Sequence, residues 1–218
     1  MIKTLFYIST LLVTCMAHGQ DMLIEQIAGK EITRSAYNKE KELISRQVFK
    51  VGPMQDNDNR LRVELQMNLY DGDGNLSKSY TTLYVCEPGK SDVLLSVFPF
   101  ARKADAEYVI DASSPGFKRL YDFEPDDKIL EDLSLEMSIE SGLLGFFGSK
   151  NIMSITERKL SQNKNGFTLK SNITIKAYLW GMKVKTIRYK VTEKLDPNKQ
   201  LLNQMFMAED GSYFLMNY

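Results

Sequence analysis

The sequence has very little histidine and cysteine. Among its 218 residues, His18 is the single histidine, and Cys15 and Cys86 are the two cysteines. His18 and Cys15 lie in an amino-terminal segment that we expect to be removed, so the mature chain would keep one thiol and no imidazole. That absence excludes a histidine general base, a Ser-His or Cys-His nucleophile pair, and a histidine metal site. One remaining cysteine also makes no intrachain disulfide.

The amino-terminal segment has the parts of a secretory signal peptide. Lys3 gives a positive start, and residues 5–14 form a short apolar run. Ala17 and Gly19 then place small residues ahead of a cleavage site before Gln20. The run is shorter than the roughly 20 apolar residues that a membrane-spanning helix needs. We therefore predict an exported protein, cleaved near Gly19, with no transmembrane segment.

A lipid anchor at Cys15 is a second interpretation of the same segment. Bacterial lipobox sequences resemble Leu-x-Gly/Ala/Ser-Cys, whereas Thr14 precedes the cysteine here. We favour cleavage near Gly19, which leaves a periplasmic or secreted protein, over lipidation of Cys15. The mature amino terminus distinguishes the two.

Neither sign of charge is in excess, because the chain has 28 basic residues (Lys and Arg together) and 28 acidic residues (Asp and Glu together). The signs are interspersed, so the sequence predicts binding neither to nucleic acid nor to an anionic membrane. After a signal peptide over residues 1–19, about 200 residues remain, which is the usual size of one domain with its own core. Residues 20–218 are therefore predicted to form a single, mostly β domain.

Apolar and polar residues alternate with a period of two in several stretches, which is typical of strands with one buried face. The predicted strands cover residues 60–70, 76–86, 133–140, 167–179, 182–193, 200–208 and 213–218. Half-buried alternation favours antiparallel pairing, since parallel strands are usually buried on both faces. A shift of the apolar phase near Lys185 and Thr186 predicts a β-bulge that bends the sheet.

The predicted fold is mainly β: a single curved antiparallel sheet, a half-barrel-like meander, with one or two short helices. Residues 21–30 have the apolar spacing of a short helix. Residues 117–131 can hold a helical turn, which Pro125 interrupts. Residues 52–59 are predicted to be a loop.

Residues 71–75 match part of a calcium-binding loop. Asp71, Asp73 and Asn75 occupy its first three ligand positions. Leu76 stands where that loop requires glycine, however, so we predict a hairpin turn and no metal.

Residues 122–132 are acidic and raise the possibility of hydrolysis by carboxylates alone. Glu124, Asp126 and Asp127 are the first candidates for that chemistry. Basic residues lie nearby, which is typical of a solvated charged loop. Without histidine or a Gly-x-Ser-x-Gly motif, we predict that the protein is not an enzyme and has no catalytic residue and no cofactor.

The segment 142–148 has an unusual composition, because four large apolar residues lie among three glycines. The apolar residues are Leu143, Leu144, Phe146 and Phe147. The segment can pack into the core, form the lip of an apolar cavity, or dock on a membrane or a partner.

Tyr178, Trp180 and Tyr189 form a predicted aromatic group near the turn at residues 180–181. They can stack on a carbohydrate or peptide, or stabilise the sheet as cross-strand pairs, which we favour. Cys86 ends a predicted strand and is interpreted as a buried, unreactive thiol.

Four short motifs resemble those of one family. Residues 70–76 are similar to its Tyr-Asp-x-x-Gly-Lys turn, and residues 130–138 to its Leu-Pro-Asp…Leu-Ser-Met-x-Met stretch. Residues 154–159 are similar to its Thr-Asn-Arg-Lys segment, and residues 209–213 to its closing Asp-x-x-Gly hairpin. The chain therefore resembles the TapB-like group of small exported proteins of Gram-negative envelopes. The resemblance implies a curved antiparallel sheet, related in shape to lipoprotein-carrier half-barrels, and carries over no catalytic residue.

The leading prediction is an exported, non-enzymatic binding protein. It would hold a lipid-like or other apolar or amphipathic ligand, or an envelope protein, in the concave face of the sheet. The predicted contacts are Leu143, Leu144, Phe146, Phe147, Tyr178 and Trp180. The alternative is a structural or assembly component of the cell envelope, whose strand at residues 213–218 pairs with a neighbour along the sheet edge.

Overall fold

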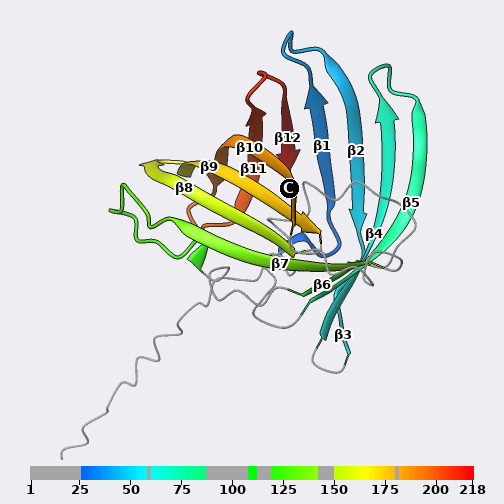
Figure 1. Cartoon of the computed structure of the whole chain (residues 1–218), viewed down its shortest axis with the longest axis horizontal. Coiled ribbons are helices and arrows are strands. Elements are labelled where there is room, and N and C mark those ends of the chain that lie inside the picture. The colour runs from blue at the N-terminus through cyan, green and yellow to red at the C-terminus, as the bar shows by residue number, and fades with distance from the viewer. Residues whose placement is uncertain (1–25, 58–59, 87–107, 112–118, 142–149, 180–181) are drawn as a thin grey trace, which may run out of the picture.

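A computed structural model describes residues 26–57, 60–86, 108–111, 119–141, 150–179 and 182–218. They form one sheet of twelve strands (Figure 1). The strands are β1 Glu31–Tyr37, β2 Leu43–Val51, β3 Gln55–Asn57, β4 Arg60–Asp71, β5 Leu76–Cys86, β6 Tyr108–Asp111, β7 Leu133–Ser141, β8 Lys150–Asn163, β9 Gly166–Leu179, β10 Met182–Leu195, β11 Leu201–Ala208 and β12 Tyr213–Asn217. Helix in the described ranges is confined to Gln26, Ile27 and a 3₁₀ position at Arg119.

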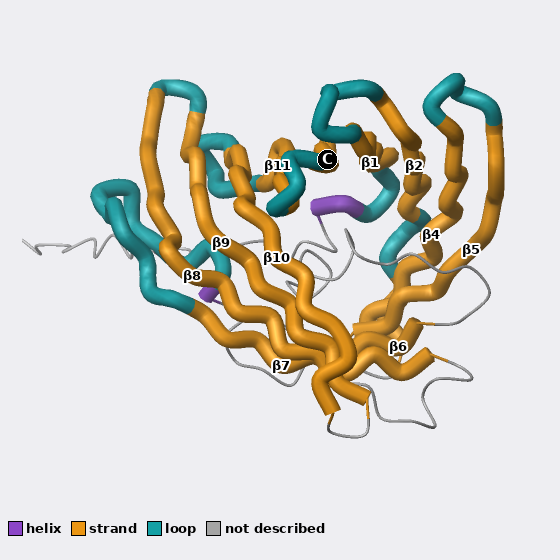
Figure 2. Tube along the Cα trace, turned by 45° about the horizontal axis from the view of Figure 1, so that its top comes forward, coloured by secondary structure: helices purple, strands orange, loops and turns teal. Residues whose placement is uncertain are grey.

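The strands lie in the order β2-β1-β12-β11-β10-β9-β8-β7-β6-β5-β4-β3. Every pairing is antiparallel except the short parallel one between β5 and β6. β2 also pairs with β4, from Ser45 opposite Asp71 to Val51 opposite Leu65. This pairing joins β2, at one end of the order, to β4, the strand next to the other end. The sheet therefore curves round, and two sides face each other across its concave face (Figure 2). The prediction of a single curved antiparallel sheet is confirmed.

All seven predicted strands are present, with ends that differ by two residues or fewer from those expected. The predicted bulge is also present, as a register shift between Lys183 and Lys185. It occurs where the apolar phase changes, because an extra residue moves the following side chains to the opposite face.

Three sequence predictions need correction. Residues 52–59 are not all loop, because β3 pairs with β4 there. The predicted helix over 21–30 does not reach residue 30, where a turn closed by the Lys30 amide and the Ile27 carbonyl leads into β1. Strand β12 is not an edge, because both β1 and β11 hydrogen-bond to it. An assembly contact through that strand has no unpaired backbone to use.

The concave side holds one hydrophobic core to which nearly every long strand contributes. Residues 119–132, which we call the strap, pack against one end of this core. Their buried side chains are Leu120, Tyr121, Phe123 and Leu130. Two backbone hydrogen bonds tie the strap to β8, from the Leu130 amide to the Arg158 carbonyl and from the Leu160 amide to the Lys128 carbonyl, both at 2.9 Å.

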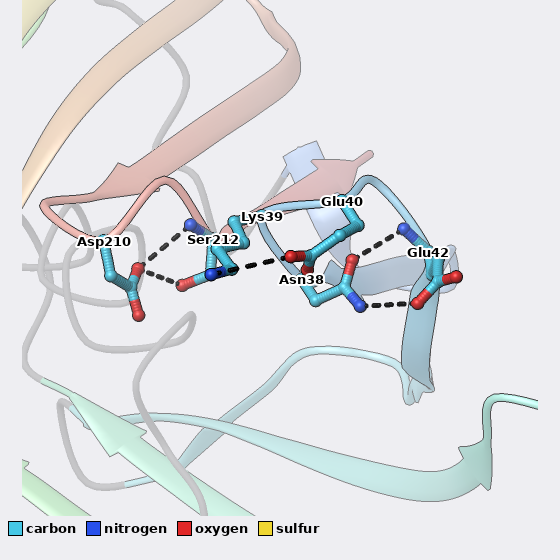
Figure 3. Close-up of polar contacts among 6 residues, drawn as sticks. All are labelled: Asn38, Lys39, Glu40, Glu42, Asp210 and Ser212. Carbon is cyan, nitrogen blue, oxygen red and sulfur yellow. Dashed lines mark hydrogen bonds and ion pairs between the residues drawn. The ribbon is translucent and has the colours of Figure 1, made fainter.

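The opposite end carries the β1–β2, β4–β5 and β11–β12 turns, and we call it the hairpin end. Two of these turns are shown in Figure 3. In the β1–β2 turn, the Glu42 amide donates to Asn38 Oδ1 at 2.8 Å. In the β11–β12 turn, the Ser212 hydroxyl and amide donate to Asp210 Oδ1 at 2.6 and 2.9 Å, and these two bonds lower the pKa of that carboxyl. Within the described ranges no helix is long and apolar enough to cross a membrane.

Candidate functional site

Six polar side chains interrupt the apolar inner face of the sheet. They are Arg34, Gln47, Arg158, Ser171, Glu193 and Gln204, all buried. Cross-strand pairing places four of them in one row, which runs Gln47–Arg34–Met216–Gln204–Glu193 over strands β2, β1, β12, β11 and β10. We call this row the polar row.

Glu193 is the centre of a hydrogen-bonded network at one end of the polar row. Its Oε1 accepts hydrogen bonds from Tyr121 Oη at 2.8 Å and from Gln204 Nε2 at 2.5 Å. Gln204 Oε1 in turn accepts a hydrogen bond from Tyr218 Oη at 2.5 Å. The network therefore connects the strap and the carboxyl-terminal residue to two neighbouring strands.

Burial controls the protonation of this network. It raises the pKa of the Glu193 carboxyl, because a charged carboxylate loses hydration in the apolar interior. The hydrogen bonds from Gln204 and Tyr121 and the positive charge of Arg158 act in the opposite direction. Burial also raises the pKa of the Tyr218 hydroxyl well above its usual value, and the charge of Glu193 adds to that shift.

Arg158 fixes the strap from the β8 side. Its side chain is 2% exposed and donates to the Glu131 carbonyl at 2.9 Å and to the Leu120 carbonyl. Glu157, just before it, has a φ of 54° at a register shift in β8, which points Arg158 inward. Desolvation lowers the pKa of Arg158, and the negative charge of Glu193 opposes that effect.

The other end of the polar row adjoins an aromatic cluster formed by Tyr189, Phe206 and Phe214. The Arg34 guanidinium lies 4.2 Å from the centroid of the Phe214 ring and donates to Gln47 Oε1 at 2.8 Å. Phe214 stacks on Phe206 with a centroid separation of 4.6 Å, and Tyr189 meets both rings edge-on. A buried cation is thus held against one aromatic face, that of Phe214.

The carboxyl groups of the network and of the strap have hydrogen-bond partners within the chain. The Glu193 carboxyl lies within the core, and its partners are the side chains of this chain. Glu124, Asp126 and Asp127 are exposed on the strap, where Asp127 Oδ2 accepts a hydrogen bond from the Glu124 amide at 2.7 Å. The described residues include no group of three His, Cys, Asp or Glu side chains that could hold a metal ion.

The Asp71 segment folds as the predicted hairpin turn. Asp71 Oδ1 accepts hydrogen bonds from the Asn75 amide at 2.8 Å and from the Asp73 amide at 3.1 Å. These bonds, with one from the Asn75 side chain, lower the pKa of Asp71. The carboxylate therefore shapes its own turn.

The predicted contact residues fall into two groups. Leu143, Leu144, Phe146, Phe147 and Trp180 lie outside the described residues. They belong to the connections from β7 to β8 and from β9 to β10.

Tyr178 lies in β9, in the phase of the exposed face, whereas Tyr189 belongs to the inner aromatic cluster. The two tyrosines therefore do not form one patch. The interpretation of Tyr189 as part of a sheet-stabilising group is supported instead.

Sequence reasoning missed the polar row, although a signal for it was present. Glu193 continues the apolar phase of Tyr189 and Val191, and Gln204 shares the phase of Phe206. A polar residue in the apolar phase of a strand indicates a buried partner, since an unpaired buried polar group is costly.

Comparison with known proteins gives a likeness in shape. No family model and no curated protein sequence matches the chain. A candidate lipoprotein from Parabacteroides distasonis is similar in structure, with a TM-score of 0.45 and 14% identity over 86% of this chain and 92% of that one. A candidate exported protein with a YmcC-like fold from Bacteroides fragilis gives a TM-score of 0.44 and 17% identity over 87% and 93% of the two chains. Likeness at this level assigns neither family nor function.

Proposed function

We propose that the protein is exported and, without catalysing a reaction, binds an apolar or amphipathic ligand at the hairpin end of its concave face. One observation carries this proposal. At the strap end of the inner face the apolar side chains are buried except Tyr218, whose hydroxyl is hydrogen-bonded to Gln204. Ala36, Tyr80, Ile187 and Tyr189, toward the hairpin end of the same face, are only partly buried. Partly exposed apolar surface on a concave face is what an apolar ligand would cover.

The charge on this part of the inner face favours an amphipathic ligand with an anionic head. Arg34 lies beside the aromatic cluster, and its positive charge also acts on Tyr80, whose pKa is raised by burial. Aliphatic or aromatic groups of the ligand would contact Ile187 and Tyr189. An anionic head would be attracted to the guanidinium.

The apolar segment 142–148 completes the proposal as the predicted lip. β7 ends at Ser141 and β8 begins at Lys150, so Leu143, Leu144, Phe146 and Phe147 lie between two strands whose inner faces carry core residues. The resemblance to the TapB-like group fits the same proposal, because it also implies a curved sheet without catalytic residues.

Native mass spectrometry of the protein recovered from its own envelope tests this function. We expect a bound species with a defined added mass, released by organic extraction. The extracted protein should then bind a fluorescent fatty acid.

The variant Ile187→Glu should bind that probe at least about tenfold more weakly, because burying a charge opposes apolar contact. Thr186→Glu, on the opposite face of the same strand, is the matched control and should bind normally. The proposal would be overturned if the recovered protein carried no ligand and did not bind the fluorescent fatty acid.

A further inference from the structure

The β9–β10 hairpin has strongly one-sided charge, although the whole chain is balanced. The two strands carry six lysines and one arginine against a single acidic residue. That acidic residue, Glu193, is buried on the inner face. Lys170, Lys190 and Lys194 are exposed on the outer face, and Lys159 of β8 lies beside them. The outer face of this hairpin therefore presents positive charge alone.

The lysines are closely spaced across the strands. Lys159 lies directly opposite Lys170 in the β8–β9 register. Lys190 and Lys194 are opposite Asn172 and Thr168, each two residues from Lys170. Like charges at directly opposed positions destabilise a sheet.

Two acidic residues of the described chain, Glu157 and Glu209, lie near these lysines. Arg188 pairs with Glu209 at 3.5 Å. Across the portion of the chain that the structure describes, Lys159, Lys170, Lys190 and Lys194 form no ion pair. A basic surface without internal partners is complementary to an anion from outside.

Two adjoining depressions lie over the same strands. Each has a volume of about 320 Å³, near the lower limit for ligand clefts. They share Asn172, Lys190 and Met207, so together they form one elongated hollow. Hydroxyl and amide side chains line it along with the lysines, at Thr156, Asn172, Thr174 and Thr192, and its acidic lining residues are Glu157 and Glu209. Such groups suit a ligand that carries both hydroxyls and negative charge.

We propose that this outer face, which we call the basic face, binds an acidic polysaccharide chain. The face is the convex side of the curved sheet (Figure 2), so a planar membrane would touch it only along a narrow line. Protein partners are usually anchored by aromatic residues or arginine at the centre of an interface. Here the exposed apolar side chain in the hollow is Met207, and the single arginine is already paired. A flexible chain of charged sugars can follow the curvature and fill both depressions.

Binding of alginate, a polymer of uronic acids, to the purified chain starting at Gln20 tests this inference. We expect saturable binding by calorimetry at low salt, weakened as salt rises because counterions screen the lysines. The double variant Lys170→Gln with Lys190→Gln should bind at least about tenfold more weakly and keep its melting temperature, because it removes repulsion. The double variant Lys30→Gln with Lys50→Gln loses the same charge elsewhere and should bind normally.

Three comparison ligands make the result decisive. Neutral dextran, poly-L-glutamate and vesicles that contain phosphatidylglycerol should each bind much more weakly than alginate. Equal or tighter binding of poly-L-glutamate or of the vesicles would overturn the proposal in favour of an acidic protein or a membrane. Absence of alginate binding, or equal losses in both double variants, would also overturn it. The inner-face ligand is measured separately, so either proposal can fail without the other.

Discussion

Among single residues, Glu193 stands out because ionising its buried carboxyl group costs free energy. Glu193 accepts hydrogen bonds from two neutral donors and lies in an apolar interior. Its raised pKa means that the unfolded chain releases this proton at a lower pH than the folded protein does. The stabilisation is therefore complete below the ordinary glutamate value of 4.5 and is lost as pH rises toward the folded pKa.

Replacement of Glu193 by glutamine isolates this effect. Glutamine can accept the same two hydrogen bonds at Oε1 but never ionises. We expect Glu193→Gln to match the wild type near pH 4 and to exceed it near pH 7 by about 1 kcal/mol, or about 2–4 °C in melting temperature. Thermal unfolding measured from pH 4 to pH 7 checks this. A difference between the two proteins that stays constant with pH would contradict it.

The faces of single residues could be predicted from the sequence, but their distant partners could not. Alternation correctly placed Leu61, Val63, Leu65 and Met67 on the buried face of one strand. It gave no partner for Glu193, because Tyr121 is 72 positions away and lies in a segment that reads as a solvated acidic loop. Pairing over such distances depends on the tertiary fold.

At the scale of elements, the strap is the least predictable part of the described chain. It contains Pro125 and six acidic residues, so its composition favours an exposed loop. Its exposed residues do follow that prediction. Between them, Leu120, Tyr121 and Phe123 are buried, and Phe123 meets Phe167 edge-on with a centroid distance of 5.2 Å. A segment without regular backbone gives no periodic signal from which such burial can be predicted.

The strap should depend on Arg158. Arg158→Met removes the donors to the Leu120 and Glu131 carbonyls, so we expect a loss of about 2–4 kcal/mol in the free energy of unfolding. Urea denaturation measures this loss, and limited proteolysis should cut within residues 119–132 first.

The matched control is Arg119→Met, which removes an exposed ion pair with Glu131 from the same strap. It should cost less than about 1 kcal/mol. Equal losses in the Arg158 and Arg119 variants would show that the buried guanidinium does not hold the strap.

The strands that could be predicted are those in which apolar and polar residues alternate regularly. β4, β7 and β9 alternate cleanly and were found with nearly correct ends. β1, β2, β3, β6 and β8 were missed. In β1 and β8 the alternation is broken, since Arg34 and Arg158 occupy inward positions and the register of β8 shifts between Thr156 and Lys159. The pairing of β2 with β4 joins segments distant in sequence and has no local signal.

Across the whole molecule, basic and acidic side chains lie on different parts of the surface, although the sequence contains equal numbers of them. The sequence has equal numbers of basic and acidic residues, from which we expected no electrostatic footprint. Folding places Lys170, Lys190 and Lys194 of β9 and β10 on one exposed face and six acidic residues on the strap. The net charge of the sequence does not reveal this separation, because the separation depends on which side chains of each strand face outward.

The proposed export leads to a prediction about the mature chain. The first core residue of the described structure is Ile27, which is 2% exposed, and β1 begins at Glu31. Cleavage after Gly19 would therefore leave the described core intact. Intact-mass analysis of the protein recovered from its own cells should give a chain that begins at Gln20, often with that residue cyclised. A chain that begins at a lipidated Cys15 would contradict this and would indicate a membrane tether.

Recombinant truncations separate cleavage from folding. A chain that begins at Gln20 should unfold at the same temperature as a chain that retains residues 1–19, because no described contact is removed. A chain that begins at Glu31 loses Ile27 and the backbone hydrogen bond from the Gly29 amide to the Gly52 carbonyl. It should lose about 2–5 kcal/mol of stability, as expected when a fully buried aliphatic side chain is deleted. If the chain from Gln20 were as unstable as the chain from Glu31, the leader would be part of the folded domain and the signal peptide assignment would be wrong.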